Sequence, residues 1–177
     1  GKRSQPLSPA LPEVVKGSMA TDGGNFVVTE DDYEQVTADT YALKYLRPYV
    51  GSKELINNRP RWCLWLTQLD PLDFEKSPEL KRRVAAERAK SKAKTTREYP
   101  HHHLFRQLGF ESGVPFVAIP EVSSQNRRYL PVATMDPGTI ISNKVYGAVD
   151  PSGFIFAIAS SSMFITWMKT VGGRLKS

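Results

Sequence analysis

A short apolar run, Arg61 to Leu66, constrains the fold more than any other stretch of the chain. Turn-forming residues close it at both ends, Asn57-Asn58-Arg59-Pro60 before it and Asp70-Pro71 after it. A run this short between such turns is typical of a buried strand. It contains Cys63, the single cysteine, which we expect to be a small buried hydrophobe. A lone cysteine forms no internal disulfide, and this favours a reducing, cytoplasmic setting.

The clearest helix start in the chain is Ser77-Pro78-Glu79. It combines a capping serine, a proline at the first helical position and an acid in the first turn. The pattern predicts a helix that runs to about Thr95. Its expected apolar stripe is Leu80, Val84, Ala85 and Ala89, and its expected cationic surface is Lys81, Arg82, Arg83, Arg88, Lys90, Lys92 and Lys94. Like charges at i,i+4 spacing repel one another, so an anion lying alongside would stabilise this helix.

The remaining segments indicate an α+β fold with a mixed, largely antiparallel sheet, a basic helix and an apolar C-terminal helical segment. The expected strands are 26–29, 114–120, 128–134 and 139–145, and the expected further helices are 40–46, stopped by Arg47-Pro48, and a stretch from Asp150 to Val171. We expect residues 1–16 to be a flexible N-terminal lead and residues 17–177 to form one domain. No apolar stretch approaches the ~20 residues that a membrane helix needs.

Positive charge is concentrated in the middle of the chain. The net charge is +6, and the block from Lys76 to Arg106 holds ten basic and three acidic residues. Such a block on an otherwise ordinary domain is typical of a protein that binds a polyanion. A solvated helix face with no partner explains the charge alone equally well.

Motifs for catalysis are missing from the sequence. It has no glycine-rich loop after a first strand, no Asn/Asp-Pro-Pro-aromatic motif and no Walker loop. His101-His102-His103 point in diverging directions on any regular backbone, so we interpret them as a solvated turn and expect no metal site. Asp70, Asp73 and Glu75 suggest a metal-dependent nuclease only weakly, because their spacing departs from the usual acid-x-Lys arrangement.

A hydrogen-bonding tract, Ser123-Ser124-Gln125-Asn126-Arg127-Arg128-Tyr129, lies between two expected strands. Gln and Asn side chains pair with the edge of adenine, and Arg pairs with guanine O6 and N7. Serine hydroxyls suit phosphates. The alternative interpretation is a polar turn that happens to carry arginines.

Four blocks of the chain resemble a known family. Gly17-Ser18-Met19 with Asp22-Gly23-Gly24 resembles the family pattern G-x-x-P-x-D-G-G, although Met19-Ala20 replaces the usual proline. The other blocks are 46–56 with the run 61–66, the tract 123–132, and Ser162-Met163 with Trp167 and residues 173–177. Together they identify the chain as a member of the target recognition domains of MmeI-like restriction–modification enzymes, which are type IIL adenine-N6 DNA methyltransferases fused to a nuclease.

The resemblance implies a domain that chooses a DNA sequence and carries out no chemistry itself. A methyltransferase domain that binds S-adenosylmethionine would precede Gly1, a nuclease would lie earlier still, and the chain would continue after Ser177. The expected partners are double-stranded DNA and the parent's own methyltransferase domain, with no cofactor in this fragment and no membrane. In this sequence Gln125 stands for the family Glu and Asn126 for a family Arg, which leaves the recognised sequence open.

Two groups of contact residues follow from the tract, the basic block and the resemblance. The expected base-contacting residues are Gln125, Asn126, Arg127, Lys92 and Ala93. The expected phosphate-contacting residues are Lys81, Arg82, Arg88, Lys90, Lys94, Arg128, Ser123 and Ser124. Two other functions remain open, a protein-interaction or structural domain that docks through its apolar C-terminal helix, and the stand-alone nuclease.

Overall fold

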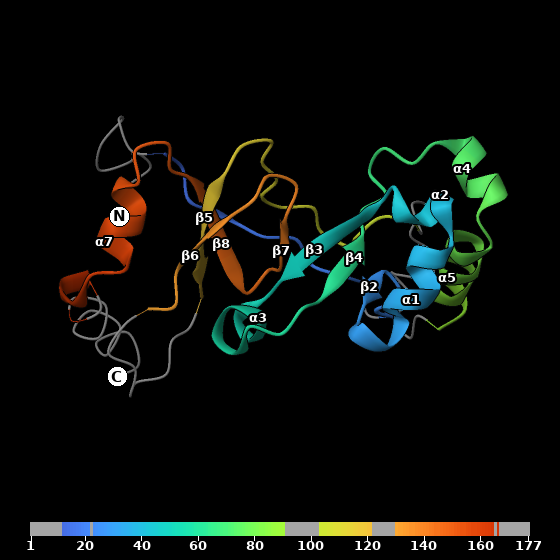
Figure 1. The fold of residues 1–177 in the computed structure, drawn as a ribbon, viewed down its shortest axis with the longest axis horizontal. Helices are drawn as coiled ribbons and strands as arrows, with labels where there is room; N and C mark the ends of the chain where they lie inside the picture. Colours follow the sequence, from blue (N-terminus) through green and yellow to red (C-terminus); the bar gives the residue numbers. More distant parts are fainter. Residues whose placement is uncertain (1–11, 22, 91–102, 122–129, 165, 167–177) are drawn as a thin grey trace, which may run out of the picture.

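The computed structural model describes residues 12–21, 23–90, 103–121, 130–164 and 166. Among them, helices and two mostly antiparallel sheets form an elongated α+β molecule (Figure 1), as the sequence predicted. Figure 1 places a group of helices at one end, the sheets in the middle and a separate helix at the other end. No helix among these residues combines the length and the apolarity that crossing a bilayer demands.

The first sheet belongs to what we call the terminal lobe. Its strands are β1 (Val15–Lys16), β8 (Val145–Val149), β5 (Phe116–Pro120) and β6 (Ala133–Met135), in that order and all antiparallel. Phe110, Phe116 and Val145 are among the apolar side chains buried on it. Helix α7 (Phe154–Ala159) lies at the outer end of this lobe (Figure 1).

The second sheet and the helices beside it form the helical lobe. The strand order is β2 (Val27–Val28), β4 (Trp62–Leu64), β3 (Leu46–Val50) and β7 (Ile140–Ile141), and only the β3–β7 pair is parallel. The helices are α1 (Glu30–Ala38), α2 (Thr40–Leu43), α3 (Ser52–Asn57), α4 (Pro71–Lys76) and α5 (Pro78–Lys90). Phe26, Leu64 and Leu80 belong to the core of this lobe.

The apolar run at 61–66 forms the predicted buried strand. β4 lies between β2 and β3, and Cys63 within it is completely buried. Burial raises the pKa of the Cys63 thiol far above its ordinary value, because the interior disfavours the thiolate. Cys63 is therefore the small buried hydrophobe that the sequence predicted.

Several predicted boundaries were wrong. The helix expected at 40–46 ends at Leu43, and Leu46 to Val50 form β3, with Pro48 inside the strand. Proline is tolerated there because β7 pairs only from Tyr49 onward, so the missing N–H of Pro48 faces no β7 partner. The segment 139–145, predicted as one strand, contains β7 and only the first residue of β8. A turn at 142–144 separates these two strands, which belong to different sheets. Strand β1 and helices α3 and α4 were not predicted.

The C-terminal helical segment begins as expected and is interrupted early. Asp150 accepts hydrogen bonds from the backbone N–H groups of Ile155 and Phe156, and α7 then ends at Ala159. The hydroxyls of Ser160 and Ser161 donate to backbone carbonyls of α7, a side-chain interaction that competes with helix continuation. Helical residues resume at 162–164.

Backbone from three parts of the chain crosses closely between the lobes. The N–H of Gly17 donates to the carbonyl of Val145 at 2.9 Å, and that of Ser18 donates to Ile141 at 2.8 Å. A Cβ on Gly17 would lie 2.3 Å from the Ile141 carbonyl oxygen, and one on Gly109 would lie 2.4 Å from that of Gly17. Only glycine fits at these crossings, because the obstructing atoms are backbone.

We therefore expect Gly17→Ala to lower the free energy of unfolding by about 1–3 kcal/mol, since overpacking forces the backbone to shift. Gly113→Ala is the matched control, because a Cβ there meets no atom within 4 Å. Urea denaturation should place the control within about 0.5 kcal/mol of the wild type. Equal effects of the two substitutions would contradict the close crossing.

Candidate nucleic-acid interface

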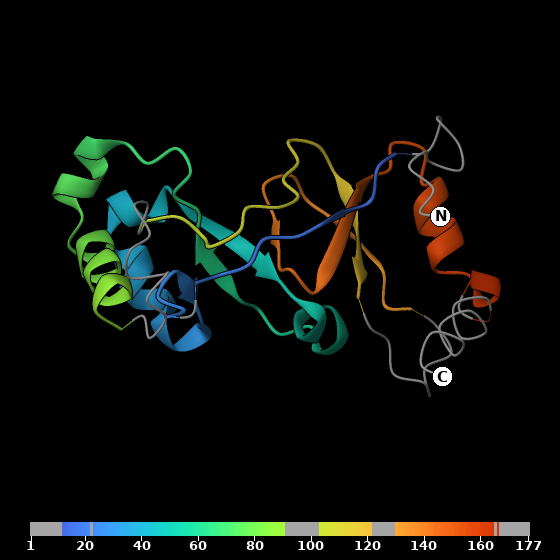
Figure 2. The same ribbon diagram turned by 180° about the vertical axis from the view of Figure 1, so that it is seen from behind.

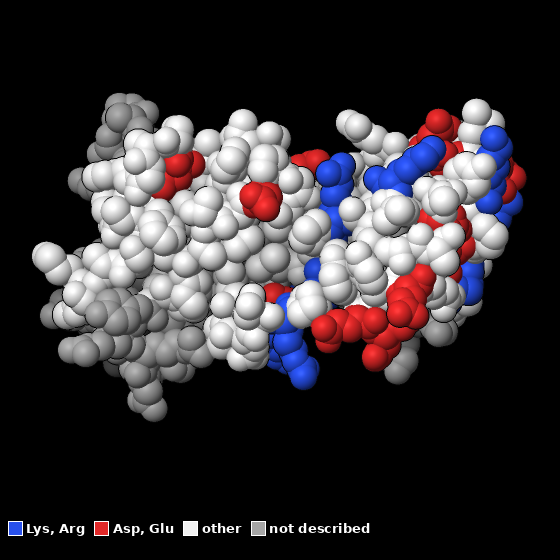
Figure 3. Space-filling view, in the orientation of Figure 1, with Lys and Arg blue, Asp and Glu red and all other residues white. Residues whose placement is uncertain are grey.

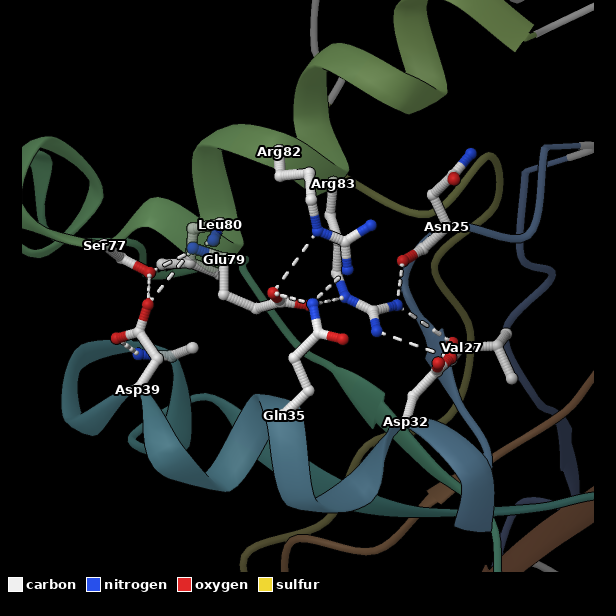
Figure 4. Close-up of polar contacts among 11 residues, drawn as sticks. Asn25, Val27, Asp32, Gln35, Asp39, Ser77, Glu79, Leu80, Arg82 and Arg83 are labelled. Atoms are coloured by element: carbon white, nitrogen blue, oxygen red, sulfur yellow. Dashed lines mark hydrogen bonds and ion pairs between the residues drawn. The ribbon is translucent and has the colours of Figure 1, made fainter.

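The predicted cationic helix, α5, begins where the sequence placed it. The backbone N–H of Leu80 donates to the hydroxyl oxygen of Ser77 at 3.1 Å, which is the expected N-cap. The same hydroxyl donates to Oδ2 of Asp39 at 2.7 Å, and that oxygen also accepts from the N–H of Glu79 at 3.1 Å (Figure 4). Asp39 thus fastens the start of α5 to the junction of α1 and α2.

The charge state of Asp39 is set by these contacts. Partial burial favours the protonated acid, but hydrogen bonds from Ser77 and from the backbone of Ala42, Glu79 and Tyr41 outweigh it and lower the pKa of Asp39. Oδ1 of Asp39 is the acceptor for Tyr41 and Ala42, so one carboxylate caps α2 and holds α5. The ionised form is the one that the fold stabilises.

A buried ion pair within α5 is hydrogen-bonded to other parts of the helical lobe. Nε of Arg83 donates to Oε1 of Glu79 at 2.7 Å, and both side chains are almost fully buried. Gln35 of α1 donates to Oε2 of Glu79, and Nη1 of Arg83 donates to the carbonyls of Asn25 and Val27 (Figure 4). Arg83 was predicted on the cationic surface of the helix, and that prediction was wrong.

One turn further along, Glu87 makes a second polar anchor. Its side chain is 1% exposed, and Oε2 accepts from both the backbone and the side-chain nitrogen of Asn25. The buried side of α5 therefore consists of Glu79, Leu80, Arg83, Val84 and Glu87, at helical spacing. Ala85 and Ala89, predicted on the apolar stripe, are exposed instead.

Three predicted phosphate-contacting side chains on α5 do face solvent. Lys81 lies 3.3 Å from Glu75, and Arg82 lies 2.7 Å from Glu79. Arg88 is exposed and has no ion pair with any residue that the structure describes. Lys81 and Arg88 are seven residues apart, which puts them on one side of the helix.

One side of the helical lobe carries many acidic side chains (Figure 3). In the orientation of Figure 1, where α1 lies in front of α5, acidic side chains form a band over the helical lobe (Figure 3). The first turn of α1 supplies Glu30, Asp31 and Asp32 to this acidic surface. Figure 2 shows the opposite side, with α5 in front. This acidic surface of α1 would repel a polyanion.

The other predicted contact residues lie outside the described part of the chain. They are Lys92, Ala93, Lys94, Ser123, Ser124, Gln125, Asn126, Arg127 and Arg128, together with the side chain of Lys90. The helix itself is described to Lys90, so its predicted end near Thr95 stays a prediction. The tract at 123–129 is bracketed by described residues of the terminal lobe, Glu121 after β5 and Leu130 before β6.

The acids considered for a nuclease hold local structure. Asp73 accepts from Lys44 at 2.8 Å and from the Tyr45 hydroxyl at 2.6 Å, and Asp70 caps α4 through the N–H of Leu72. The hydrogen bond from Lys44, followed by that from Tyr45, lowers the pKa of Asp73. Among the described residues no three His, Cys, Asp or Glu side chains gather as metal ligands would. His101 and His102 lie outside those residues.

A family model described as "MmeI, target recognition domain" matches residues 1–177. The chain belongs to the MmeI target recognition domain family. It is similar to DNA methyltransferase A of Bacillus subtilis (strain 168), with 31% identity over 179 residues that cover 99% of this chain and 20% of the relative. It also matches a solved structure of the type IIL restriction–modification enzyme MmeI in complex with DNA, at a TM-score of 0.83 and 35% identity. That match covers 94% of this chain and 23% of the other, so the chain spans about a fifth of these relatives' length.

The positioning network of this MmeI-type domain was missed in the sequence, although a signal for it was present. Glu79, Arg83 and Glu87 follow one another at i,i+4 spacing, which pairs opposite charges along one helix side. Asp39 carried no such signal, because its partners Ser77 and Glu79 are about forty residues away and only the fold brings them together.

Arg83→Ala should destabilise the domain strongly, by about 3–5 kcal/mol, because it removes the buried partner of the Glu79 carboxylate and leaves the carbonyls of Asn25 and Val27 without their donor. Arg82 would remain beside Glu79, but its side chain is half exposed. Arg88→Ala is the matched control. It removes the same side chain from the exposed side of the same helix and should change the free energy of unfolding by less than about 0.5 kcal/mol. Urea denaturation followed by circular dichroism measures both. A small effect of Arg83→Ala would contradict the structural role of the ion pair.

The lowered pKa of Asp39 makes a pH dependence testable. A carboxyl group whose pKa is lowered by folding adds stability above its unfolded pKa of about 4, and that stability is lost as pH falls through the folded value. Asp39→Asn should therefore be less stable than the wild type at pH 7, and the difference should shrink below about pH 4. Denaturation curves at a series of pH values test this, and a difference that stays constant into acid would oppose it.

Proposed function

We propose that this chain is the specificity domain of a site-specific adenine-N6 DNA methyltransferase of the restriction–modification type. The observation that carries the proposal is the whole-chain match to the MmeI target recognition domains, together with the similarity to an MmeI structure solved in complex with DNA. The domain selects a sequence in double-stranded DNA and performs no chemistry. The remainder of the polypeptide binds S-adenosylmethionine and methylates the target in the cytoplasm.

Two kinds of contact divide the work in this proposal. Lys81, Arg82 and Arg88 on α5, continued by Lys90 and Lys94, bind phosphates and fix the register of the duplex. The exposed ion pair of Lys81 with Glu75 is weak enough to be exchanged for a phosphate contact. Gln125, Asn126 and Arg127 read base edges in the major groove, assisted by Lys92 and Ala93. Ser123, Ser124 and Arg128 hold the backbone next to that tract.

The chemistry of adenine methylation supports a division of DNA recognition and catalysis between two domains. The N6 of an adenine is not accessible to a catalytic site while the base is stacked, so a methyltransferase must turn the base out of the duplex. A separate domain that holds the flanking duplex keeps the register while one base leaves it. Besides DNA, the domain would therefore contact the methyltransferase domain of the same polypeptide.

A docking function is favoured by a second observation. Phe154, Ile158 and Met163 on and after α7 expose 52%, 43% and 81% of their surfaces. Exposed apolar side chains that lie close together mark a contact with protein. The methyltransferase domain of the same polypeptide fits this role without excluding DNA binding through α5 and the tract at 123–129.

Sequencing of host DNA for N6-methyladenine, with and without the gene for the full-length protein, tests the proposed function. We expect one short motif to be fully modified only when the gene is present. Deletion of this domain from the gene should abolish modification of that motif. A methylation pattern that does not depend on the gene would refute the proposal.

Substitutions in the two contact groups should behave differently. Arg127→Ala in the full-length protein should relax preference at one base pair by about 1–3 kcal/mol, because a bidentate contact to one base is lost. Lys81→Ala should weaken binding to every duplex alike and flatten the dependence of affinity on salt. Fluorescence anisotropy with duplexes that carry single base changes separates the two results. If both substitutions act alike on all duplexes, the division between phosphate and base contacts is wrong.

A further inference from the structure

Helix α3 and the loop after it form an exposed polar projection between the two lobes (Figure 1). We call Lys53, Asn57, Asn58 and Arg59 the α3 projection. All four are exposed, and none of their side chains makes a hydrogen bond or ion pair with another residue that the structure describes. They therefore present an ammonium, two amides and a guanidinium whose donors and acceptors have no partner among the described residues.

The projection stands on a fixed base. Glu54 accepts from the N–H of Gly51 at 2.8 Å and from Nη2 of Arg61 at 3.1 Å, and its other oxygen lies 3.0 Å from Nε of Arg61. The Arg61 guanidinium stacks 4.6 Å from the ring centre of Tyr49, which is buried in β3. The two ends of the projection are thus held to the sheet, which lowers the entropy that a contact would cost.

Asn58 has a backbone conformation that restricts what the position accepts. It lies in the left-handed region at φ 49 and ψ 36, and it is the one non-glycine residue with positive φ among those described. Glycine would adopt this conformation at lower cost. Asparagine instead keeps an amide at the tip of the loop.

The projection lies beside both ends of the predicted base-reading tract. A hollow of about 290 Å³ is lined by Asn58 and Arg59 together with Ala133 and Met135 of β6, shortly after the tract. A second hollow of about 470 Å³ is lined by Lys53 together with Lys144 and Glu121. Of these, Glu121 lies shortly before the tract in the sequence. Described residues that precede and follow the segment 122–129 thus line hollows next to the α3 projection.

We infer that the α3 projection is a further DNA-contacting element of this domain, and the inference rests on the proposed function. Lys53 and Arg59 contact phosphates of the duplex on which the tract reads bases. The Asn58 amide pairs with a base edge, which for asparagine is the N6/N7 edge of adenine. The DNA contacts then come from three places, α5, the tract and the α3 projection.

Selection from a randomised duplex library by the full-length protein, followed by sequencing, tests the role of Asn58. Asn58→Gly preserves the left-handed backbone and removes only the amide, so the domain should remain folded, as its thermal transition would verify. We expect the preference at one base pair to fall about tenfold while the rest of the selected motif stays the same. An unchanged motif would overturn the role assigned to Asn58.

The two cations are tested by affinity as a function of salt. Arg59→Gln and Lys53→Gln should weaken binding to every duplex and should each lower the slope of log affinity against log salt by about 0.9. Arg47→Gln is the matched control, since Arg47 is also exposed without an ion pair among the described residues but lines a separate hollow with Trp65 and Gly138. If Arg47→Gln weakens binding as much as Arg59→Gln, only net charge matters and the inference fails.

The outcomes distinguish this inference from the proposed function. If Lys81→Ala weakens binding and the substitutions in the α3 projection leave affinity and motif intact, the projection has no contact role and the proposed function stands. If the full-length protein binds no duplex at low salt, both fail. If the motif and the salt slope change as stated, the α3 projection is a DNA contact.

Discussion

The ion pair between Glu79 and Arg83 determines which side of α5 reaches solvent. Only Leu80 and Val84 give the buried side of this helix an apolar contribution, and apolar contact has no direction. The hydrogen bonds of Arg83 to the carbonyls of Asn25 and Val27 do have direction, and they allow one rotation of the helix about its axis. Lys81 and Arg88 face outward because Arg83 and Glu87 face inward. Arg83, which was expected at the surface, is therefore the buried residue that orients Lys81 and Arg88 toward solvent.

The two lobes are linked by strands as well as by loops. β7 pairs with β3 in the helical lobe, and β8, three residues later, pairs with β5 in the terminal lobe. The segment around Gly17 and Ser18 crosses between the same two lobes through hydrogen bonds to Val145 and Ile141. Contacts made by different lobes keep a fixed geometry only if such links resist bending. In the proposed recognition, Gly17 and Gly109 therefore contribute by allowing the close backbone crossing between the lobes. Neither residue is proposed to contact DNA.

The sequence predicted features that depend on neighbouring residues. The strand at β4 and the N-cap of α5 at Ser77 follow from short patterns, and both are confirmed. The rotation of α5 was predicted correctly for Leu80 and Val84, which face inward. The pattern assigns charged residues to the outside, and it was wrong for Arg83, which the structure buries together with Glu79 and Glu87. The strand through Pro48 was missed because only the pairing of its neighbours, which is a property of the whole fold, makes a proline acceptable there. The proposed contact residues of the α3 projection have no periodicity to detect, and the proposal for them rests on their position in the fold.

The α3 projection also shows how backbone conformation limits specificity. A domain that reads DNA through connections between strands can change those side chains without removing buried contacts, so specificity can vary while the core stays the same. Position 58 is less free, because its left-handed conformation favours glycine, asparagine and aspartate over other residues. Of these, asparagine forms hydrogen bonds with the N6/N7 edge of adenine, and aspartate accepts a hydrogen bond from the amino group of cytosine. Glycine has no side chain and forms no such contact. In the proposed contact, the backbone at position 58 therefore limits which bases the side chain there is able to select, whereas no positive φ restricts Arg59.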